Sequence, residues 1–343
     1  MSISLKPWIA KVPTYIPGAV EKGFIKLSSN ENNYGPSQEV LTALKKNLRN
    51  IKLYPSQDKE VREALAEYVR VKSENILVGN GSDELIDLIL KTFNGPVLSY
   101  YPTFPEYKIC SLILGMKYLE IPLNPDFSFP IEDYLEKAKN ANLLFLSNPN
   151  NPTGGVVEIE EIKEILKLGK LTVIDEAYCE FSGKSMVELL PEYPNLIILR
   201  TMSKAFALAG LRIGYMIASK NIVNHVRKVK PPFNVNFLAE VAAIAALQDL
   251  EYMRKCVRKI VKDRERIEKE LSRKFRVIPS QANFIFFDVH PSSSENIYQY
   301  FLKNKIILRN FGHLKGFKGE WLRVSVGTKK EVDEFLRVLR ALA

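Results

Sequence analysis

Cysteine and histidine are scarce in this chain of 343 residues, which contains three of each. Cys110, Cys179 and Cys256 lie far apart, and none of them belongs to a Cys-X-X-Cys pair. This distribution argues against a disulfide framework and against a zinc site. The three histidines are scattered and add no metal-ligand spacing, so we expect no metal centre.

Long apolar runs are missing as well. No run is long enough to span a membrane, and the N-terminus has no signal-peptide core. These absences predict a cytoplasmic protein with no membrane partner. Hydrophobic residues make up 46% of the chain and charged residues 26%, which is typical of a soluble globular protein and unlike a disordered one.

The net charge is +10, which on its own is compatible with nucleic acid, a membrane surface or anionic metabolites as partners. The basic residues are nevertheless spread along the chain, apart from residues 254–276, where they alternate with acids as on an exposed helix face. The sequence has neither a basic stripe with interleaved aromatic residues nor a nucleic-acid recognition module. We therefore expect small-molecule partners and no nucleic acid.

Short β-branched or apolar segments alternate with helical patterns through the middle of the chain, which is typical of a mainly parallel sheet with crossover helices. The expected strands are 76–79, 96–100, 117–121, 143–147, 171–175, 196–200 and 212–218. We predict an α/β fold in which a large domain holds this seven-stranded sheet between helices. Ligands are then expected beyond the carboxyl ends of the strands.

The length of the chain favours a second domain. Residues 1–33 contain three spaced prolines and predict an extended arm, and residues 34–236 would form the large domain. Residues 237–343 are expected to form a smaller α+β domain that begins with one long connecting helix over about 237–275. Its expected strands are 275–278, 283–289, 306–309 and 322–326, followed by a closing helix from Thr328.

Lys204 follows the apolar run Leu196–Arg200, at the carboxyl end of an expected buried strand. Desolvation lowers the pKa of a lysine, and its neutral amine can attack a carbonyl. Such an amine can form a Schiff base with an aldehyde, as in enzymes that use pyridoxal 5′-phosphate (PLP). A lone lysine at a strand end more often only extends its charge into solvent, so the interpretation depends on neighbouring motifs.

Two segments that follow expected strands supply groups for a pyridine ring. Ser147–Gly154 is rich in turn residues, but its Asn151 also offers an amide that can hydrogen-bond a phenolate oxygen. A second strand ends at Asp175, three positions before Tyr178. A buried carboxylate keeps a pyridine nitrogen protonated, and a phenol can donate to the 3′-oxygen of the ring. The alternative for Asp175 is a helix cap.

Gly79–Glu84 opens a helical pattern, and a helix start with glycine can bind a phosphate through free N–H groups. A capped helix without a ligand is an equal alternative for this segment alone. Ser203 and Arg212 would add donors, and the fork of an arginine suits a phosphate better than lysine does. Phe104, in a loop after another expected strand, is a candidate for stacking on the ring, with a place in the core as its alternative.

Together these motifs resemble those of the fold type I PLP-dependent aminotransferases, in the same order and from about Pro13 to the C-terminus. The motifs are GNGSDE (79–84), SNPNNPTG (147–154), DEAY (175–178) and TMSKAFALAGLRIGY (201–215). Within this group the chain is most similar to the histidinol-phosphate aminotransferases. That similarity lies in residues 15–18, 26–32, 34–37, 53–55, 102–104 and 322–328.

The resemblance implies an amino transfer between histidinol phosphate and 2-oxoglutarate, in histidine biosynthesis, by a homodimer with shared active sites. Lys204 would hold PLP and later move a proton, Asp175 would pair with the pyridinium, and Tyr178 would hold the ring oxygen. The other implied cofactor-binding residues are Gly81, Ser82, Asp83, Phe104, Asn151, Thr201, Ser203 and Arg212, with Tyr54 reaching in from the partner subunit. The implied substrate-binding residues are Tyr15, Asn32, Asn151, Arg309 and Arg323. The arm would pack on the small domain and on the partner.

Two departures from the family pattern stand out. Asn33 occupies a position where relatives usually have proline, and residues 310–319, between the two anion-binding arginines, are irregular. Two other activities on the same scaffold remain alternatives, an aromatic amino acid aminotransferase and a threonine-phosphate decarboxylase. A PLP-binding regulator without catalysis is disfavoured, because Lys204, Asp175 and Arg212 are all present.

Overall fold

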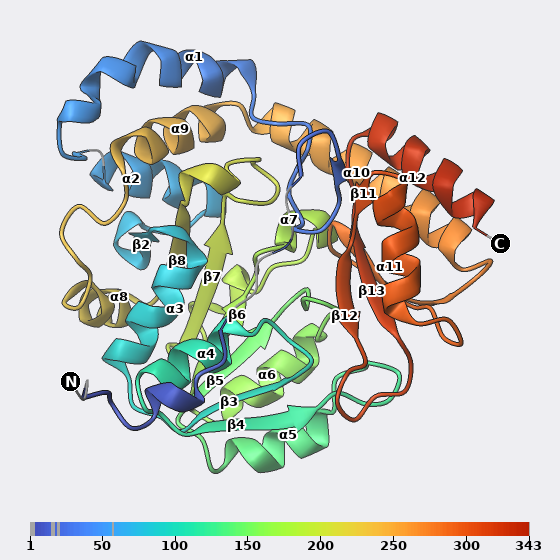
Figure 1. Cartoon of the computed structure of the whole chain (residues 1–343). Helices are drawn as coiled ribbons and strands as arrows, with labels where there is room; N and C mark the ends of the chain where they lie inside the picture. The colour runs from blue at the N-terminus through green and yellow to red at the C-terminus, as the bar shows by residue number, and fades with distance from the viewer. Residues whose placement is uncertain (1–3, 15–17, 19–20, 57, 343) are drawn as a thin grey trace.

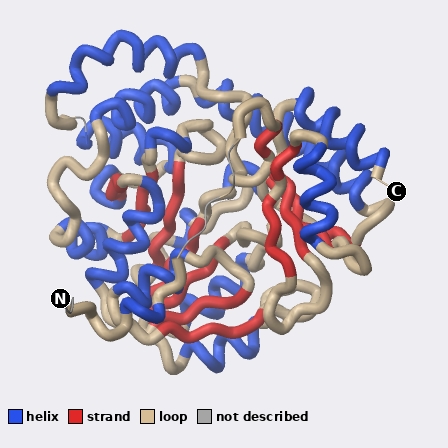
Figure 2. The backbone as a smooth tube through the Cα atoms, viewed as in Figure 1, coloured by secondary structure: helices blue, strands red, loops and turns tan. Residues whose placement is uncertain are grey.

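The computed structural model describes residues 4–14, 18, 21–56 and 58–342. Figure 1 shows a large twisted sheet with helices on both of its faces and, at the right, a smaller sheet that helices α10, α11 and α12 flank. In the tube view of Figure 2, the described ends of the chain lie on opposite sides of the molecule. The predicted α/β architecture is confirmed.

The large sheet has seven strands in the order β2-β8-β7-β6-β5-β3-β4. Its strands are β2 (Ile76–Gly79), β3 (Val97–Tyr101), β4 (Tyr118–Pro122), β5 (Leu143–Ser147), β6 (Leu171–Asp175), β7 (Leu196–Thr201) and β8 (Gly214–Ala218). Only β8 runs antiparallel to its neighbours, β2 and β7. It begins two residues later than predicted, because Arg212 has a φ of 56°, which lies in the left-handed region and not in the extended one.

Helices cover both faces of the large sheet, and α10, α11 and α12 flank the small one. The α-helices are α1 (Gln38–Asn47), α2 (Asp58–Val69), α3 (Gly81–Thr92), α4 (Glu106–Ile113), α5 (Ile131–Ala138), α6 (Ile159–Lys167), α7 (Cys179–Ser182), α8 (Lys220–Arg227), α9 (Phe237–Gln248), α10 (Leu250–Leu271), α11 (Ser294–Lys303) and α12 (Lys329–Ala341). Short 3-10 turns are η1 (Ile9–Lys11), η2 (Leu48–Lys52), η3 (Ser73–Asn75), η4 (Val187–Leu189) and η5 (Ala209–Leu211).

Successive residues of the central strands enter two different hydrophobic cores. In β5, Leu144 and Leu146 join the core that includes residues of α2, α6 and α9. Leu143 and Phe145 point the other way and join a core with residues of α3, α4 and α8. Because both faces are buried, the strand is apolar throughout, as the continuous Leu-Leu-Phe-Leu pattern predicted.

The prediction of a single long helix over 237–275 is wrong. The chain forms α9 and α10 instead, and they are separated at Asp249, whose side chain accepts a hydrogen bond from the backbone N–H of Tyr252 at 3.4 Å. This is N-cap chemistry, which starts a new helix. Helix α9 packs against α1 and α2, whereas α10 packs against α12 and β10. The domain boundaries stay a prediction, but this packing favours a boundary at Asp249 over one at 236.

The small sheet has the order β12-β13-β10-β9. Its strands are β9 (Arg276–Ile278), β10 (Phe284–Asp288), β12 (Arg309–Gly312) and β13 (Trp321–Ser325). The strand expected over 306–309 is divided, because Ile306–Ile307 forms β11 and pairs with β1 (Ile25–Lys26) of the N-terminal arm. The closing helix α12 begins as predicted, with a capping box between Thr328 and Glu331.

The carboxyl ends of the parallel strands meet at one edge of the large sheet. Ser147 of β5 pairs in register with Asp175 of β6, and Thr201 ends the neighbouring strand β7. Gly79 at the end of β2 and Thr201 both pair with Gly214 of β8, so the start of α3 also reaches this edge. Across the described residues, none of the helices combines the length and the apolar character needed to cross a membrane.

Candidate active site

A cavity of about 270 Å³ lies at this edge of the sheet, where the rule for open α/β sheets predicts a ligand site. Twelve of the residues singled out from the sequence line it: Ser82, Asp83, Phe104, Asn151, Asp175, Tyr178, Thr201, Ser203, Lys204, Arg212, Arg309 and Arg323. Residues that are as far apart in the sequence as Ser82 and Arg323 therefore share one pocket.

Lys204 follows β7 and is partly buried in the cavity, with its Nζ 3.1 Å from the backbone oxygen of Ser29. Burial lowers the pKa of its amine to about 8, and the nearby guanidinium of Arg323 acts in the same direction. A lysine with this pKa has a substantial neutral fraction near physiological pH. The amine is therefore ready for nucleophilic attack or for proton transfer.

Asp175 is 3% exposed at the end of β6. Burial raises the pKa of its carboxyl to about 6, although two hydrogen bonds to the carboxylate oppose the shift. The Tyr107 hydroxyl donates to Oδ2 at 2.7 Å, and the N–H of Ala177 donates to Oδ1 at 3.1 Å. This carboxylate is held in place and lacks a cation among these contacts, so it is suited to pair with a positively charged ring nitrogen.

Tyr107 is a functional residue that sequence reasoning missed. It lies on the first turn of α4, is fully buried, and its ring packs edge-on against Phe104 with the centroids 5.7 Å apart. One residue therefore contacts both the carboxylate and the aromatic side chain expected to face the cofactor ring. The only signal in the sequence was its place three residues after Phe104, on the first turn of the helix that follows this loop.

The turn between β2 and α3 brings hydrogen-bond donors together beside the cavity, because Gly81 allows Arg212 to approach it closely. Gly81 has a φ of +81°, and a Cβ at this position would lie 2.6 Å from Nη2 of Arg212. Arg212 donates to Asp83 at 2.7 Å and to Ser203 Oγ at 3.5 Å, while Ser203 also accepts a hydrogen bond from Thr201 at 2.9 Å. Free N–H groups at the start of α3 add to these donors, which suits a phosphate.

Arg323 of β13 is 6% exposed and closes the opposite side of the cavity. Its Nη1 donates to Oδ1 of Asn151, and its Nη2 donates to the backbone oxygen of Ser28 at 2.9 Å. The guanidinium also lies 5.0 Å from the ring centroid of Phe284 and 5.5 Å from that of Phe311. These contacts fix both the arginine and the side-chain amide of Asn151.

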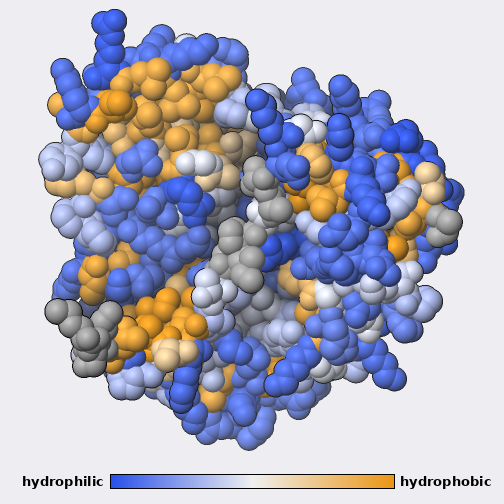
Figure 3. All heavy atoms as spheres, viewed as in Figure 1, coloured by the Kyte–Doolittle hydropathy of each residue, from blue (hydrophilic) through white to orange (hydrophobic). Residues whose placement is uncertain are grey.

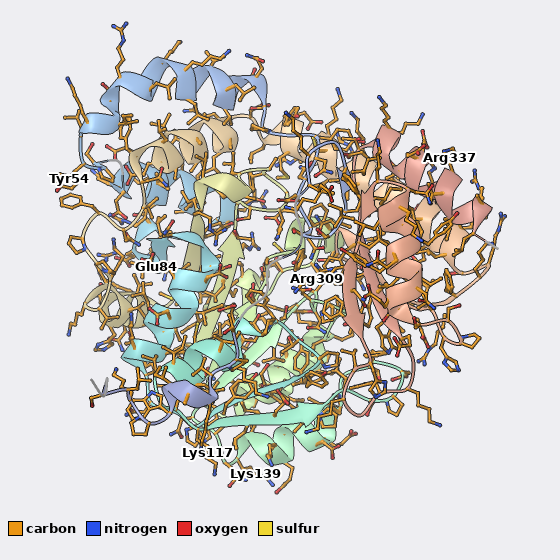
Figure 4. All side chains as sticks on the ribbon, viewed as in Figure 1. Tyr54, Glu84, Lys117, Lys139, Arg309 and Arg337 are labelled. Atoms are coloured by element: carbon orange, nitrogen blue, oxygen red, sulfur yellow. The ribbon has the colours of Figure 1, made fainter. Side chains whose placement is uncertain are left out.

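Arg309 is the direct cross-strand partner of Arg323 in the β12–β13 ladder. Residues opposite each other on paired strands point to the same face of a sheet, so two guanidinium groups face the cavity together. Figure 4 shows Arg309 directed toward the centre of the molecule. Phe311, which lies 6.0 Å from Arg309 and also contacts Arg323, lines the cavity and was not singled out from the irregular segment 310–319.

Three predicted site residues do not line the cavity, and a fourth is not among the described residues. The side-chain amide of Asn32 donates a hydrogen bond to the backbone oxygen of Ala205 at 2.9 Å. This bond supports the loop beside Lys204 from outside the cavity. Tyr54 is 76% exposed, and Figure 4 shows it at the outer edge of the molecule. Gly81 does not line the cavity but allows Arg212 to approach closely, and Tyr15 lies outside the described residues.

Comparisons with known proteins find relatives with the same architecture. The family described as Aminotransferase class I and II matches residues 22–339. A histidinol-phosphate aminotransferase of Thermococcus gammatolerans is 40% identical over 324 residues, which cover 93% of this chain and 92% of that relative.

Two solved structures are similar over nearly their whole length. The histidinol-phosphate aminotransferase of Clostridium acetobutylicum is 31% identical with a TM-score of 0.87, and the match covers 93% of this chain and 98% of that one. The enzyme of the same name from Sinorhizobium meliloti, in complex with pyridoxal-5′-phosphate, is 27% identical with a TM-score of 0.89 and coverages of 99% and 98%. The fold, the strand-end cavity and these matches agree, and the chain belongs to the class I and II aminotransferase family.

Proposed function

We propose that this aminotransferase moves the amino group of histidinol phosphate to 2-oxoglutarate, giving imidazole-acetol phosphate and L-glutamate in histidine biosynthesis. The facing pair Arg309 and Arg323 carries this choice of substrate. Two guanidinium groups on one face repel each other, and an anion between them relieves the repulsion. A phosphomonoester dianion balances two positive charges better than a single carboxylate does. The names of the relatives support the same substrate.

We propose PLP as the cofactor, because the residues of the cavity fit it. The start of α3, Ser203 and Arg212, which Gly81 allows to approach closely, suit its phosphate. The buried carboxylate of Asp175 suits its protonated ring nitrogen, and Phe104 lines the same cavity. When bound, PLP supplies an electron-withdrawing ring that stabilises negative charge at the substrate carbon.

The roles of the side chains follow from this arrangement. Lys204 holds the cofactor between turnovers, and as a free neutral amine it moves the proton at the substrate carbon, for which its lowered pKa is suitable. Asp175 maintains the positive charge on the ring nitrogen. Because Arg323 occupies Oδ1 of Asn151, the amide nitrogen of Asn151 remains to donate toward the cofactor, together with the hydroxyl of Tyr178.

A substrate panel tests this function. Purified enzyme with PLP is mixed with histidinol phosphate, histidinol, phenylalanine or threonine phosphate, and the absorbance of the cofactor is followed through a single half-reaction. We expect histidinol phosphate to react with a kcat/KM about a hundredfold above that of histidinol, which lacks the phosphate. A preference for phenylalanine would indicate an aromatic amino acid aminotransferase. Release of carbon dioxide from threonine phosphate would indicate a decarboxylase.

We also propose that the chain works as a homodimer, with Tyr54 reaching the cofactor site of the partner. Tyr54 stacks on Phe233 at 4.5 Å, and both rings are more than half exposed. Leu48, Ile51 and Leu53 in the adjoining segment are also exposed. Figure 3 shows hydrophobic atoms gathered over the region of α1 and α9, next to this segment. Burial of such a patch in a dimer is favourable.

Sedimentation equilibrium tests the dimer. We expect the wild-type protein to have twice the mass of the chain and the variant Ile51→Asp to dissociate. Ile159→Asp, which alters an exposed isoleucine on α6, is the matched control and should leave the dimer intact. A monomeric wild-type protein with full activity would contradict the proposal.

A further inference from the structure

Asn30 lies inside the site, although no role was given to it by the motifs. It is 2% exposed, its φ is 56°, and it lines the cavity together with Tyr178 and Lys204. Its side-chain nitrogen Nδ2 lies 3.0 Å from the hydroxyl oxygen of Tyr178, to which it donates a hydrogen bond. Asparagine tolerates this left-handed backbone better than most residues do, so the position favours asparagine on conformational grounds as well.

The hydrogen bonds around Asn30 fix the orientation of its amide. The backbone N–H of Asn30 donates to Oγ of Ser325 at 2.8 Å. The hydroxyl of Ser325 donates in turn to Oδ1 of Asn30 at 2.8 Å. Since Oδ1 faces Ser325, Nδ2 must face Tyr178. The phenol oxygen of Tyr178 is therefore an acceptor in this bond, and its own hydrogen is directed along another one.

We propose that Asn30 is a positioning residue that directs the hydroxyl hydrogen of Tyr178 into the cavity and links Tyr178 to the strand that carries Arg323. This inference rests on the proposed roles of Tyr178 and Lys204. A hydroxyl that accepts one hydrogen bond becomes a stronger donor in its next one, so Asn30 strengthens the bond that Tyr178 donates. The residue acts through Tyr178 and does not itself contact the reacting atoms.

The link to the substrate end runs through two paired strands. Ser325 lies two residues after Arg323 on β13, so their side chains point to the same face. The backbone oxygen of Asn30 also accepts a hydrogen bond at 3.0 Å from Asn283, which immediately precedes β10. The next residue, Phe284, packs its ring edge-on against Tyr178 with the centroids 5.1 Å apart. Tyr178 therefore contacts Asn30 and the small domain at once.

The expected effect is on the proton affinity of the nitrogen by which Lys204 holds the cofactor. A phenol that donates to the ring oxygen makes this oxygen a poorer acceptor for the proton on the neighbouring nitrogen, so the nitrogen loses its proton at lower pH. The charged groups around Lys204 are Arg323 of β13 and Arg212, which lower its pKa, and Glu31 of the arm and Asp83 of α3, which raise it. None of these is altered in the variants below.

The test is a pH titration of the absorbance of the lysine-bound cofactor, which requires no turnover. We expect Asn30→Ala to raise the proton affinity of the nitrogen that joins Lys204 to the cofactor about fivefold to tenfold. This is the effect expected from the loss of one hydrogen bond. Ser325→Ala, which keeps Asn30 but removes the partner of its Oδ1, should give a smaller shift in the same direction. Asn33→Ala is the matched control in the same loop and should give no shift, since its amide contacts Glu331 and not Tyr178.

A double-mutant cycle separates this role from a merely structural one. In the Tyr178→Phe background, Asn30→Ala should change the proton affinity less than twofold, because the hydroxyl through which it acts is missing. The inference is overturned if Asn30→Ala has the same effect with and without that hydroxyl, or has no effect with it. If Asn30→Ala does not fold, Ser325→Ala is compared in both backgrounds and decides in the same way.

The same titration distinguishes failure of the proposed function from failure of the inference on Asn30. If Lys204 does not hold the cofactor, the wild-type protein gives no lysine-bound absorbance to titrate. If Tyr178 does not donate to the ring oxygen, Tyr178→Phe alone leaves the titration unchanged.

Discussion

The two ends of the cavity are built in different ways. The cofactor end consists largely of residues at or shortly after the carboxyl ends of strands of the large sheet, such as Asp175, which ends β6, and Lys204, three residues after β7. The substrate end brings together β12, β13 and the N-terminal arm, and its hydrogen bond from Arg323 to Ser28 joins residues that are 295 positions apart. A parallel sheet sets the first arrangement almost by itself, whereas the second depends on how the arm and the small domain pack.

The two ends also differ in charge. The cofactor end buries a carboxylate, Asp175, whose raised pKa of about 6 reflects the cost of that burial. The substrate end opposes two guanidinium groups, Arg309 and Arg323, on neighbouring strands. A cationic ring nitrogen would complement the charge of the first end, and a phosphate would complement the charge of the second. Variants that alter only one end should separate the two functions.

The largest effect is expected at the cofactor end from Lys204→Ala. We expect turnover to fall about a thousandfold or more, because both the attachment point and the proton-transferring amine are lost. The absorbance of lysine-bound cofactor should disappear from the spectrum. Lys228→Ala, at an exposed lysine outside the cavity, is the control and should leave both unchanged. Full turnover by Lys204→Ala would show that another group performs these steps.

A large effect, mainly on substrate binding, is expected from Arg323→Lys. A lysine cannot reproduce the guanidinium bonds to Asn151 and Ser28, so KM for the phosphorylated amine should rise about a hundredfold. Arg309→Lys should raise it about tenfold, because Arg309 is only half-buried. The cofactor should remain attached in both variants. Loss of the cofactor from either would mean that the two ends are not separable.

A smaller effect is expected at the cofactor end from Tyr107→Phe. This change removes the hydrogen bond to Oδ2 of Asp175 but keeps the aromatic packing against Phe104. The carboxylate form of Asp175 is then less stable, and kcat should fall about tenfold with KM for the substrate little changed. Steady-state kinetics of Tyr107→Phe and of the wild-type protein measure the change in kcat and in KM separately. A change of about tenfold in KM, with kcat unchanged, would instead assign Tyr107 to the substrate end.

The pH dependence of cofactor attachment gives the smallest but most specific effect. The amine of Lys204 attacks only when it is neutral, so below its pKa of about 8 the rate should rise about tenfold per pH unit and level off above it. Stopped-flow absorbance with the cofactor-free protein measures this rate. In Arg323→Gln, which removes a nearby positive charge, the plateau should move to higher pH. A wild-type plateau near the ordinary lysine value would show that Lys204 is not desolvated.

Sequence reasoning predicted the cofactor end better than the substrate end, for physical reasons. The buried strands carry continuous apolar patterns, and their ends fix where Asp175 and Lys204 must lie. Phe311 and Asn30 could not be found in this way. Phe311 belongs to a short edge strand with an irregular pattern, and Asn30 has its role only through contacts with Tyr178 and Ser325, which are distant in the sequence.

The break between α9 and α10 shows a further limit. The apolar and charged residues over 237–271 fit one helical pattern, and only the cap formed by Asp249 interrupts it. A single aspartate inside a helical pattern is common, so its capping role could not be distinguished from an exposed position. The two helices pack on different parts of the molecule, which is a tertiary effect that local propensity does not contain.

The central claim is that Lys204, three residues after the end of β7, is the residue that holds the cofactor. Borohydride reduction of the protein with bound PLP, followed by peptide mass spectrometry, tests it directly, because reduction turns the lysine–cofactor bond into a stable link. We predict a single pyridoxyl phosphate group on Lys204 in the peptide that spans residues 201–212. A modification at any other lysine, with Lys204 left unmodified, would contradict this account of the site.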